Sequence, residues 1–137
     1  MELTFQIRGG DFTSAGTASS KVRRTLKELG IDASVIKRVV IALYEAEVNI
    51  VAHAYNGQIT ASIDPEQVFL KLVDEGPGIA DIERAMTPGF STASQQVREM
   101  GFGAGMGLTN ICRNADVFNI HSIPGKGTTV EITIQIK

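Results

Sequence analysis

Two side chains that could handle a phosphoryl group lie one helical turn apart. Glu45 and Asn49 are four residues apart in a segment with helical periodicity, so they share one helix face. A glutamate can act as a general base. An asparagine amide oxygen can complete a Mg²⁺ shell that is otherwise filled by phosphates and water. His53 continues this face by one more turn. The alternative is an ordinary solvated helix face, because this spacing is common.

A second group of residues follows a strand-like run. Asp74 comes directly after that run, and Gly76 and Gly78 follow it. A carboxylate at this position can accept a hydrogen bond from an exocyclic amine such as that of adenine. Glycines allow the backbone to approach a flat ring closely. The alternative is a tight strand-to-helix turn, in which Asp, Gly and Pro are expected in any case.

Alternating glycines precede the last helical pattern of the chain. Gly101, Gly103, Gly105 and Gly107 leave backbone N–H groups accessible at a helix N-terminus, which is a good cradle for phosphate. The segment is not a P-loop, because no Gly-Lys-Ser/Thr follows, and it is a poor Rossmann fingerprint, because no strand precedes it. A flexible hinge is the alternative interpretation.

A threonine at the start of the last strand pattern forms a fourth candidate. Thr128 has the same strand parity as Val130 and Ile132, which predicts that it faces the core. A hydroxyl on that side needs a hydrogen-bonding partner. A bound ligand or the Asp74 carboxylate could be that partner. The alternative is a β-branched residue that simply favours a strand.

Hydrophobic periodicity predicts the elements that position these residues. We expect strands over 2–8, 58–63, 68–73, 117–123 and 128–136, helices over 13–29, 34–55, 79–86 and 105–114, and a mobile loop over 87–103. This order predicts an α+β fold: a two-layer sandwich with helices on one face of a mostly antiparallel, mixed sheet. The 137 residues suffice for a single domain spanning 1–137.

Composition excludes several classes of protein. The net charge is −2 and basic residues are scattered, so we expect no nucleic-acid partner. No apolar run approaches the roughly 20 residues of a membrane span, and the N-terminus does not resemble a signal peptide. The single cysteine, Cys112, allows no internal disulfide and is expected to be a small core residue. These features predict a cytoplasmic protein.

The four groups occur in one order along nearly the whole chain, about residues 3 to 136. Together they resemble the GHKL ATPase superfamily, whose ATP-binding fold is the Bergerat fold: a Glu-x-x-x-Asn box, an Asp-x-Gly-x-Gly box, a glycine-rich box and a terminal Gly-Thr. Residues 76–82, 89–92 and 103–105 are similar to the bacterial anti-sigma-factor kinases, the group that includes the partner-switching kinase of stressosomes.

The resemblance implies ATP and Mg²⁺ as cofactors and gives each box a role. Glu45 would be the catalytic base and Asn49 the Mg²⁺ ligand. In the second box, Asp74 would bind the adenine amino group and Gly78, with Gly76, would line the base. The remaining roles are phosphate contacts from Gly101, Gly103, Gly105 and Gly107, and support of the adenine site by Thr128.

The resemblance also implies an activity and partners. The chain would transfer the γ-phosphate of ATP to a Ser or Thr of a STAS-type antagonist, with a sigma factor and a second copy of the chain as further possible partners. The alternative is a nucleotide-gated anti-sigma factor without kinase activity. The catalytic half of a split histidine kinase is disfavoured, because the chain has no room for a dimerising helical hairpin. Glu47 lies on another helix face than Glu45 and is expected to be a poor substitute base.

Overall fold

The computed structural model describes residues 1–78 and 107–136. Within them lie five strands: β1 (Glu2–Arg8), β2 (Asn56–Ile63), β3 (Gln67–Glu75), β4 (Val117–Ile123) and β5 (Gly127–Gln135). The helices are a 3₁₀ turn η1 (Phe12–Ser14), α1 (Thr17–Glu28), α2 (Ala33–His53) and α5 (Gly107–Asn114). The predicted helix over 79–86, the predicted loop over 87–103, and Gly101, Gly103 and Gly105 lie outside the described residues.

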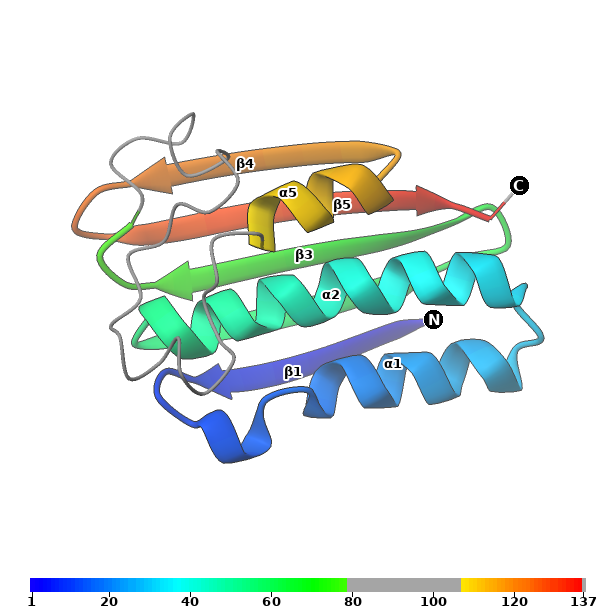
Figure 1. Ribbon diagram of the computed structural model, residues 1–137, viewed down its shortest axis with the longest axis horizontal. Coiled ribbons are helices and arrows are strands. Elements are labelled where there is room, and N and C mark those ends of the chain that lie inside the picture. Colours follow the sequence, from blue (N-terminus) through cyan, green and yellow to red (C-terminus); the bar gives the residue numbers. More distant parts are fainter. Residues whose placement is uncertain (79–106, 137) are drawn as a thin grey trace.

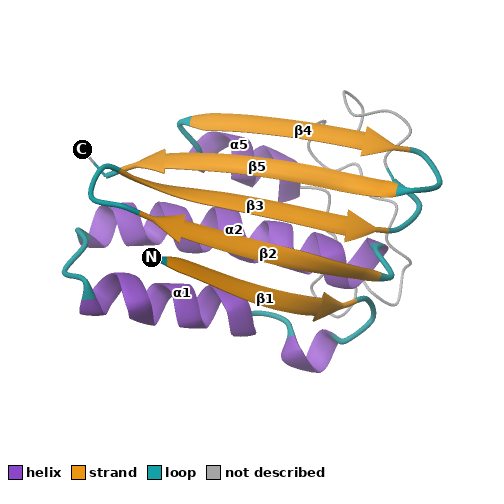
Figure 2. Cartoon of the chain, turned by 180° about the vertical axis from the view of Figure 1, so that it is seen from behind, coloured by secondary structure: helices purple, strands orange, loops and turns teal. Residues whose placement is uncertain are grey.

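The five strands form one sheet in the order β1-β2-β3-β5-β4. Both predicted hairpins, β2–β3 and β4–β5, are present, and the pairing of β3 with β5 joins them. All four pairings are antiparallel, so the described strands do not form the mixed sheet that was expected. The helices lie on one face of the sheet (Figure 1), and the opposite face is in front when the molecule is seen from behind (Figure 2). The predicted α+β sandwich is confirmed.

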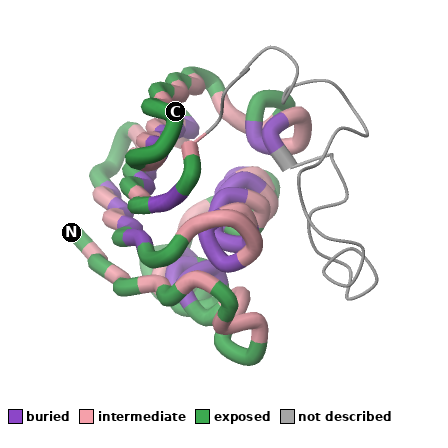
Figure 3. Tube along the Cα trace, turned by 90° about the vertical axis from the view of Figure 1, so that its left-hand side faces the viewer, coloured by how far each residue is buried: buried purple, intermediate pink, exposed green. Residues whose placement is uncertain are grey.

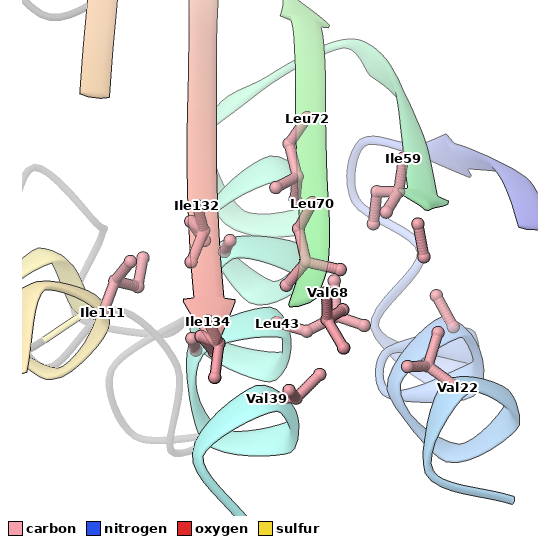
Figure 4. Close-up of a cluster of buried hydrophobic side chains, with 14 of the residues drawn as sticks. Val22, Val39, Leu43, Ile59, Val68, Leu70, Leu72, Ile111, Ile132 and Ile134 are labelled. Carbon is pink, nitrogen blue, oxygen red and sulfur yellow. The ribbon is translucent and has the colours of Figure 1, made fainter. Parts of the chain in front are cut away.

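The core lies between the sheet and its helix layer. Alternate residues of β2, β3 and β5 are buried on the helix side, as expected for a sheet with one covered face. Val68 and Leu70 of β3 meet Val39 and Leu43 of α2 in the same cluster (Figure 4). The buried stripe of α2 faces the sheet along the helix (Figure 3). Among the described helices, none combines the length and the apolar character needed to cross a membrane.

The first predicted helix is interrupted. It was expected to run from Thr13, but the chain forms η1 and then restarts as α1 at Thr17. The Asp11 carboxylate accepts a hydrogen bond from the Ser14 N–H and so caps η1. Gly16 then adopts a φ of +96°, a left-handed conformation that a helix cannot contain. The apolar spacing continued across this break and concealed it.

Two further expectations were wrong in detail. Helix α2 ends at His53, and Asn56 begins β2 instead of ending the helix. The Tyr55 N–H donates to the Glu75 carbonyl, so the chain has already joined the sheet there. Cys112 is exposed and is not a core residue. Ile111, its neighbour on the short helix α5, is the residue that is fully buried.

Candidate nucleotide site

Helix α2 carries the first candidate pair close above the sheet. Glu45 and Asn49 are both half-buried, one turn apart on α2. The next residue, Ile50, packs on Gly57 of β2, where an added Cβ would lie 2.9 Å from Ile50 Cγ2. Glycine at this position therefore allows the C-terminal half of α2 to lie close to the strand end that carries Asp74, which is paired with Gly57.

The second and fourth candidates meet at the end of β3. The Thr128 N–H donates to Asp74 Oδ1 over 3.1 Å. Thr128 is buried on the helix side of β5, as its strand parity predicted. Its hydroxyl lies 2.9 Å from the Ser122 hydroxyl of β4, so the partner of the Thr128 side chain is Ser122. Ser122 was missed, although it shares the inward parity of Phe118 and Ile120 in the predicted hairpin.

Two titratable groups near this end of the molecule are shifted by burial. Loss of water raises the pKa of the Asp74 carboxyl above its ordinary value of 3.8, and the Thr128 N–H partly opposes this shift. Burial also lowers the pKa of His53, at the end of α2, below its ordinary value of 6.5. Both shifts disfavour the charged form. A donor that reached the Asp74 carboxylate would offset part of its desolvation.

Gly76 and Gly78 have a packing role of their own. A Cβ on Gly76 would lie 2.9 Å from Ala54 Cα, and one on Gly78 would lie 2.5 Å from the Ile123 carbonyl oxygen. Gly78 also has a φ of +72°, which favours glycine. The Gly76 N–H donates to the Lys126 carbonyl. These glycines therefore let the end of β3 pack against α2 and the β4–β5 turn, and contact with a nucleotide stays a prediction.

Helix α5 adds a residue that the sequence reasoning did not identify. Gly107 is its first residue, and Leu108 and Ile111 bury its apolar side. Asn110 Nδ2 donates to Glu45 Oε1 over 3.3 Å. The available signal was a polar residue three positions after the last glycine of the glycine-rich segment.

Glu47 is engaged elsewhere, in agreement with its expected place on another face of the helix. Its side chain is fully buried, and its two oxygens accept hydrogen bonds from the start of α1. Glu45, in contrast, is half-buried and faces α5. Of the two carboxylates, only Glu45 is partly exposed to solvent.

The structure brings the candidates together as two separate pairs of contacts. Strand β3 ends and β5 begins at the same end of the sheet, and the C-terminal half of α2 reaches that end (Figure 1). Asp74 and Thr128 are in direct contact there, and Glu45 contacts Asn110 across the α2–α5 interface. The structure does not describe how Gly101, Gly103 and Gly105 relate to them.

Comparison with known proteins finds relatives over most of the chain. An anti-sigma F factor of Thermoanaerobacter sp. (strain X514) is 33% identical over 142 residues, which cover 97% of this chain and 91% of that protein. The serine/threonine-protein kinase RsbT of Bacillus subtilis (strain 168) is 35% identical over 113 residues, covering 80% of this chain and 79% of that protein.

Solved structures share the fold. A crystal structure of the RsbU and RsbW domains of a Mycobacterium tuberculosis protein matches 98% of this chain and 32% of that longer chain, with a TM-score of 0.66 and 20% identity. The mycobacterial sensor histidine kinase MprB matches 98% of this chain and 97% of its own, with a TM-score of 0.55 and 18% identity.

The model of the histidine kinase-like ATPase domain matches residues 11–134, which include all four motif groups. Membership of this family implies ATP binding. The resemblance found in the sequence is confirmed, and the chain belongs to the histidine kinase-like ATPase domain family.

Proposed function

We propose that this chain is an ATP-dependent serine/threonine protein kinase of the anti-sigma-factor group, acting on a Ser or Thr of a STAS-type antagonist protein. The observation that carries the proposal is the environment of the Glu45 side chain. This carboxylate is half-buried, shares a face of α2 with Asn49, and is held by Asn110 of α5. A kinase relative at 35% identity and anti-sigma F factor relatives at 33% support the same group.

The residues present fit a bound nucleotide with Mg²⁺. Asp74, desolvated at the end of β3, would accept from the adenine amine, and Thr128 would keep its carboxylate in place. The start of α5 at Gly107 would face the phosphates. Within the described residues no three His, Cys, Asp or Glu side chains gather to hold a metal. Mg²⁺ would take the Asn49 amide oxygen as a protein ligand, with phosphates and water completing the shell.

The proposed step transfers the phosphoryl group directly to the acceptor, so it needs a base for the hydroxyl proton and forms no covalent enzyme intermediate. The hydroxyl oxygen of the acceptor Ser or Thr forms a bond to the γ-phosphorus while the bond to the β–γ bridging oxygen breaks, and ADP leaves with that electron pair. Glu45 takes the hydroxyl proton. When bound, Mg²⁺ neutralises charge on the phosphates.

A nucleotide-gated anti-sigma factor is the second candidate, because several relatives bear the name anti-sigma F factor. In that case nucleotide would set the affinity for a sigma factor, and no phosphate would be transferred. Both roles can reside in one chain, so the assay must separate catalysis from binding.

The Glu45→Gln variant makes this separation. With radiolabelled ATP, Mg²⁺ and purified STAS proteins, phosphotransfer should fall about 10²- to 10⁴-fold, as expected when a positioned base is removed. ATP affinity measured by calorimetry should not change. Glu66→Gln, in the exposed turn between β2 and β3, is the matched control and should transfer phosphate at the wild-type rate. Wild-type rates in Glu45→Gln would refute the catalytic assignment and leave the binding role.

A further inference from the structure

Two helices that are distant in sequence are joined at the proposed base. Glu45 lies in the middle of α2, and Asn110 lies in the middle of α5, 65 residues later. An amide nitrogen only donates and a carboxylate oxygen only accepts, so the direction of this hydrogen bond is determined. The bond uses one oxygen of Glu45, Oε1. The second oxygen, Oε2, belongs to the same rigid carboxylate, so its direction is also set by Asn110.

A second set of contacts fixes the backbone that carries Asn110. Arg38 lies two turns before Glu45 on α2 and donates through Nε to the Asn114 carbonyl over 3.1 Å. Asn114 Nδ2 in turn donates to the Asn110 carbonyl over 2.8 Å. Arg38 also pairs with Asp116, just beyond α5, at 3.1 Å. Helix α5 is therefore joined to α2 at its middle, through Asn110, and at its C-terminal end, through Arg38.

Packing alone does not require an asparagine at this position. Leu108 and Ile111 bury the apolar side of α5, and asparagine is a poorer helix former than leucine or alanine. The hydrogen bond to Glu45 explains why an asparagine can occupy this helical position.

We propose that Asn110 is a positioning residue for the proposed base. This inference rests on the proposed function. The Asn110 amide holds Oε1 of Glu45, and this orients Oε2 toward the hydroxyl whose proton it accepts. Because Asn110 lies three residues after Gly107, where α5 begins, the same bond ties the direction of the base to the helix that follows the glycine-rich segment.

The test compares two leucine variants of one helix. Asn110→Leu keeps the branched shape of the side chain and removes the donor, while Cys112→Leu places the same side chain at an exposed position of the same helix that takes no part in these contacts. Each variant is assayed beside the wild-type chain, with ATP, Mg²⁺ and the STAS protein that the wild type phosphorylates. Asn110→Leu should lower kcat about tenfold relative to wild type, because loss of one hydrogen bond to a charged group usually has an effect of this size. The KM for ATP should not change. Cys112→Leu should keep kcat within about twofold.

A double variant separates positioning from a merely structural role. If Asn110 acts through Glu45, adding Asn110→Leu to Glu45→Gln should cause no further loss of kcat, because effects of residues that act as a unit are not additive. An equal loss in both backgrounds, or an unchanged kcat in Asn110→Leu alone, overturns the inference. Wild-type rates in Glu45→Gln instead refute the proposed function, which is a different outcome. If Asn110→Leu does not fold, Asn110→Ala, which removes the amide donor without adding a charge or a larger side chain, takes its place in both comparisons.

Discussion

The buried carboxylate of Glu47 should be a major source of stability, and Glu47→Gln tests this. Helix α1 begins at Thr17 after Gly16, which has no side chain to cap it. Glu47, 31 residues away from Gly16 on α2, supplies the cap instead. Its Oε2 accepts from the N–H groups of Gly16 (3.0 Å) and Ala18 (3.2 Å). Its Oε1 accepts from the N–H (3.1 Å) and the hydroxyl (2.7 Å) of Ser19.

The size of the effect follows from these four donors. A glutamine has the same shape but presents an NH₂ group in place of one oxygen, so at least one buried backbone N–H loses its acceptor. An unsatisfied buried donor costs about 1–3 kcal/mol, and the remaining bonds lose the assistance of the negative charge. The carboxylate also loses its favourable interaction with the positive N-terminus of α1. We expect Glu47→Gln to lower the free energy of unfolding by about 3 kcal/mol, a large part of the stability of a small domain.

Urea unfolding followed by circular dichroism measures this loss. The midpoint should fall by about 1–2 M urea with an unchanged slope. Glu45→Gln is the matched control: it is the same change two residues away on α2, at a half-buried side chain, and should cost less than about 1 kcal/mol. Equal midpoints for Glu47→Gln and wild type would show that water satisfies the start of α1, and the capping role would be refuted.

Two further predictions concern the shifted groups near the site. Burial lowers the pKa of His53 because the neutral ring is favoured in the folded state. The contribution of His53 to the free energy of unfolding is therefore complete above pH 6.5 and is lost as the pH falls through the lowered folded-state pKa. His53→Gln should therefore flatten the dependence of unfolding free energy on pH between about 7.5 and 5.5, and an unchanged dependence would contradict the burial argument. Burial raises the pKa of Asp74, so its ionised form costs stability once the pH rises through that raised value. Asp74→Asn should weaken ADP binding by about 1–3 kcal/mol in calorimetry without lowering the urea midpoint at neutral pH, and wild-type ADP affinity would remove the adenine assignment.

The strands and hairpins could be predicted from the sequence because their signal is local. Alternation of apolar residues gave both hairpins within a few residues of their observed bounds, and the parity of Thr128 correctly placed it on the buried side. Motif spacing also gave the family, since each box keeps its residue types and its order along the chain. Register and face follow from a period of two wherever one side of a sheet is covered.

Contacts between distant elements could not be predicted in the same way. The cap on α1 comes from Glu47, and the contact to Glu45 comes from Asn110, 65 residues later. Neither pair has a spacing that periodicity can detect. The break before α1 was concealed for a related reason: the left-handed Gly16 lies where Glu47, on another helix, accepts hydrogen bonds from the Gly16 and Ala18 N–H groups. Tertiary contacts overrode local propensity at these positions.

The environments of three aspartates distinguish those that stabilise the fold from the one proposed to bind a ligand, although all three have the same side chain. Asp32 caps α2 and its pKa is lowered by hydrogen bonds from Ser34. Asp116 lies before β4, and its pKa is lowered first by a backbone hydrogen bond from Gln135 and then by Arg38. Both lie at the end of the fold where α2 and β4 begin (Figure 1), and both favour the folded state when ionised. Asp74, at the opposite end, is shifted upward by desolvation. A carboxylate held at a cost to the fold is the one for which a ligand donor gives most benefit, and this supports the proposal that Asp74, at the end of β3, accepts from the base of a nucleotide.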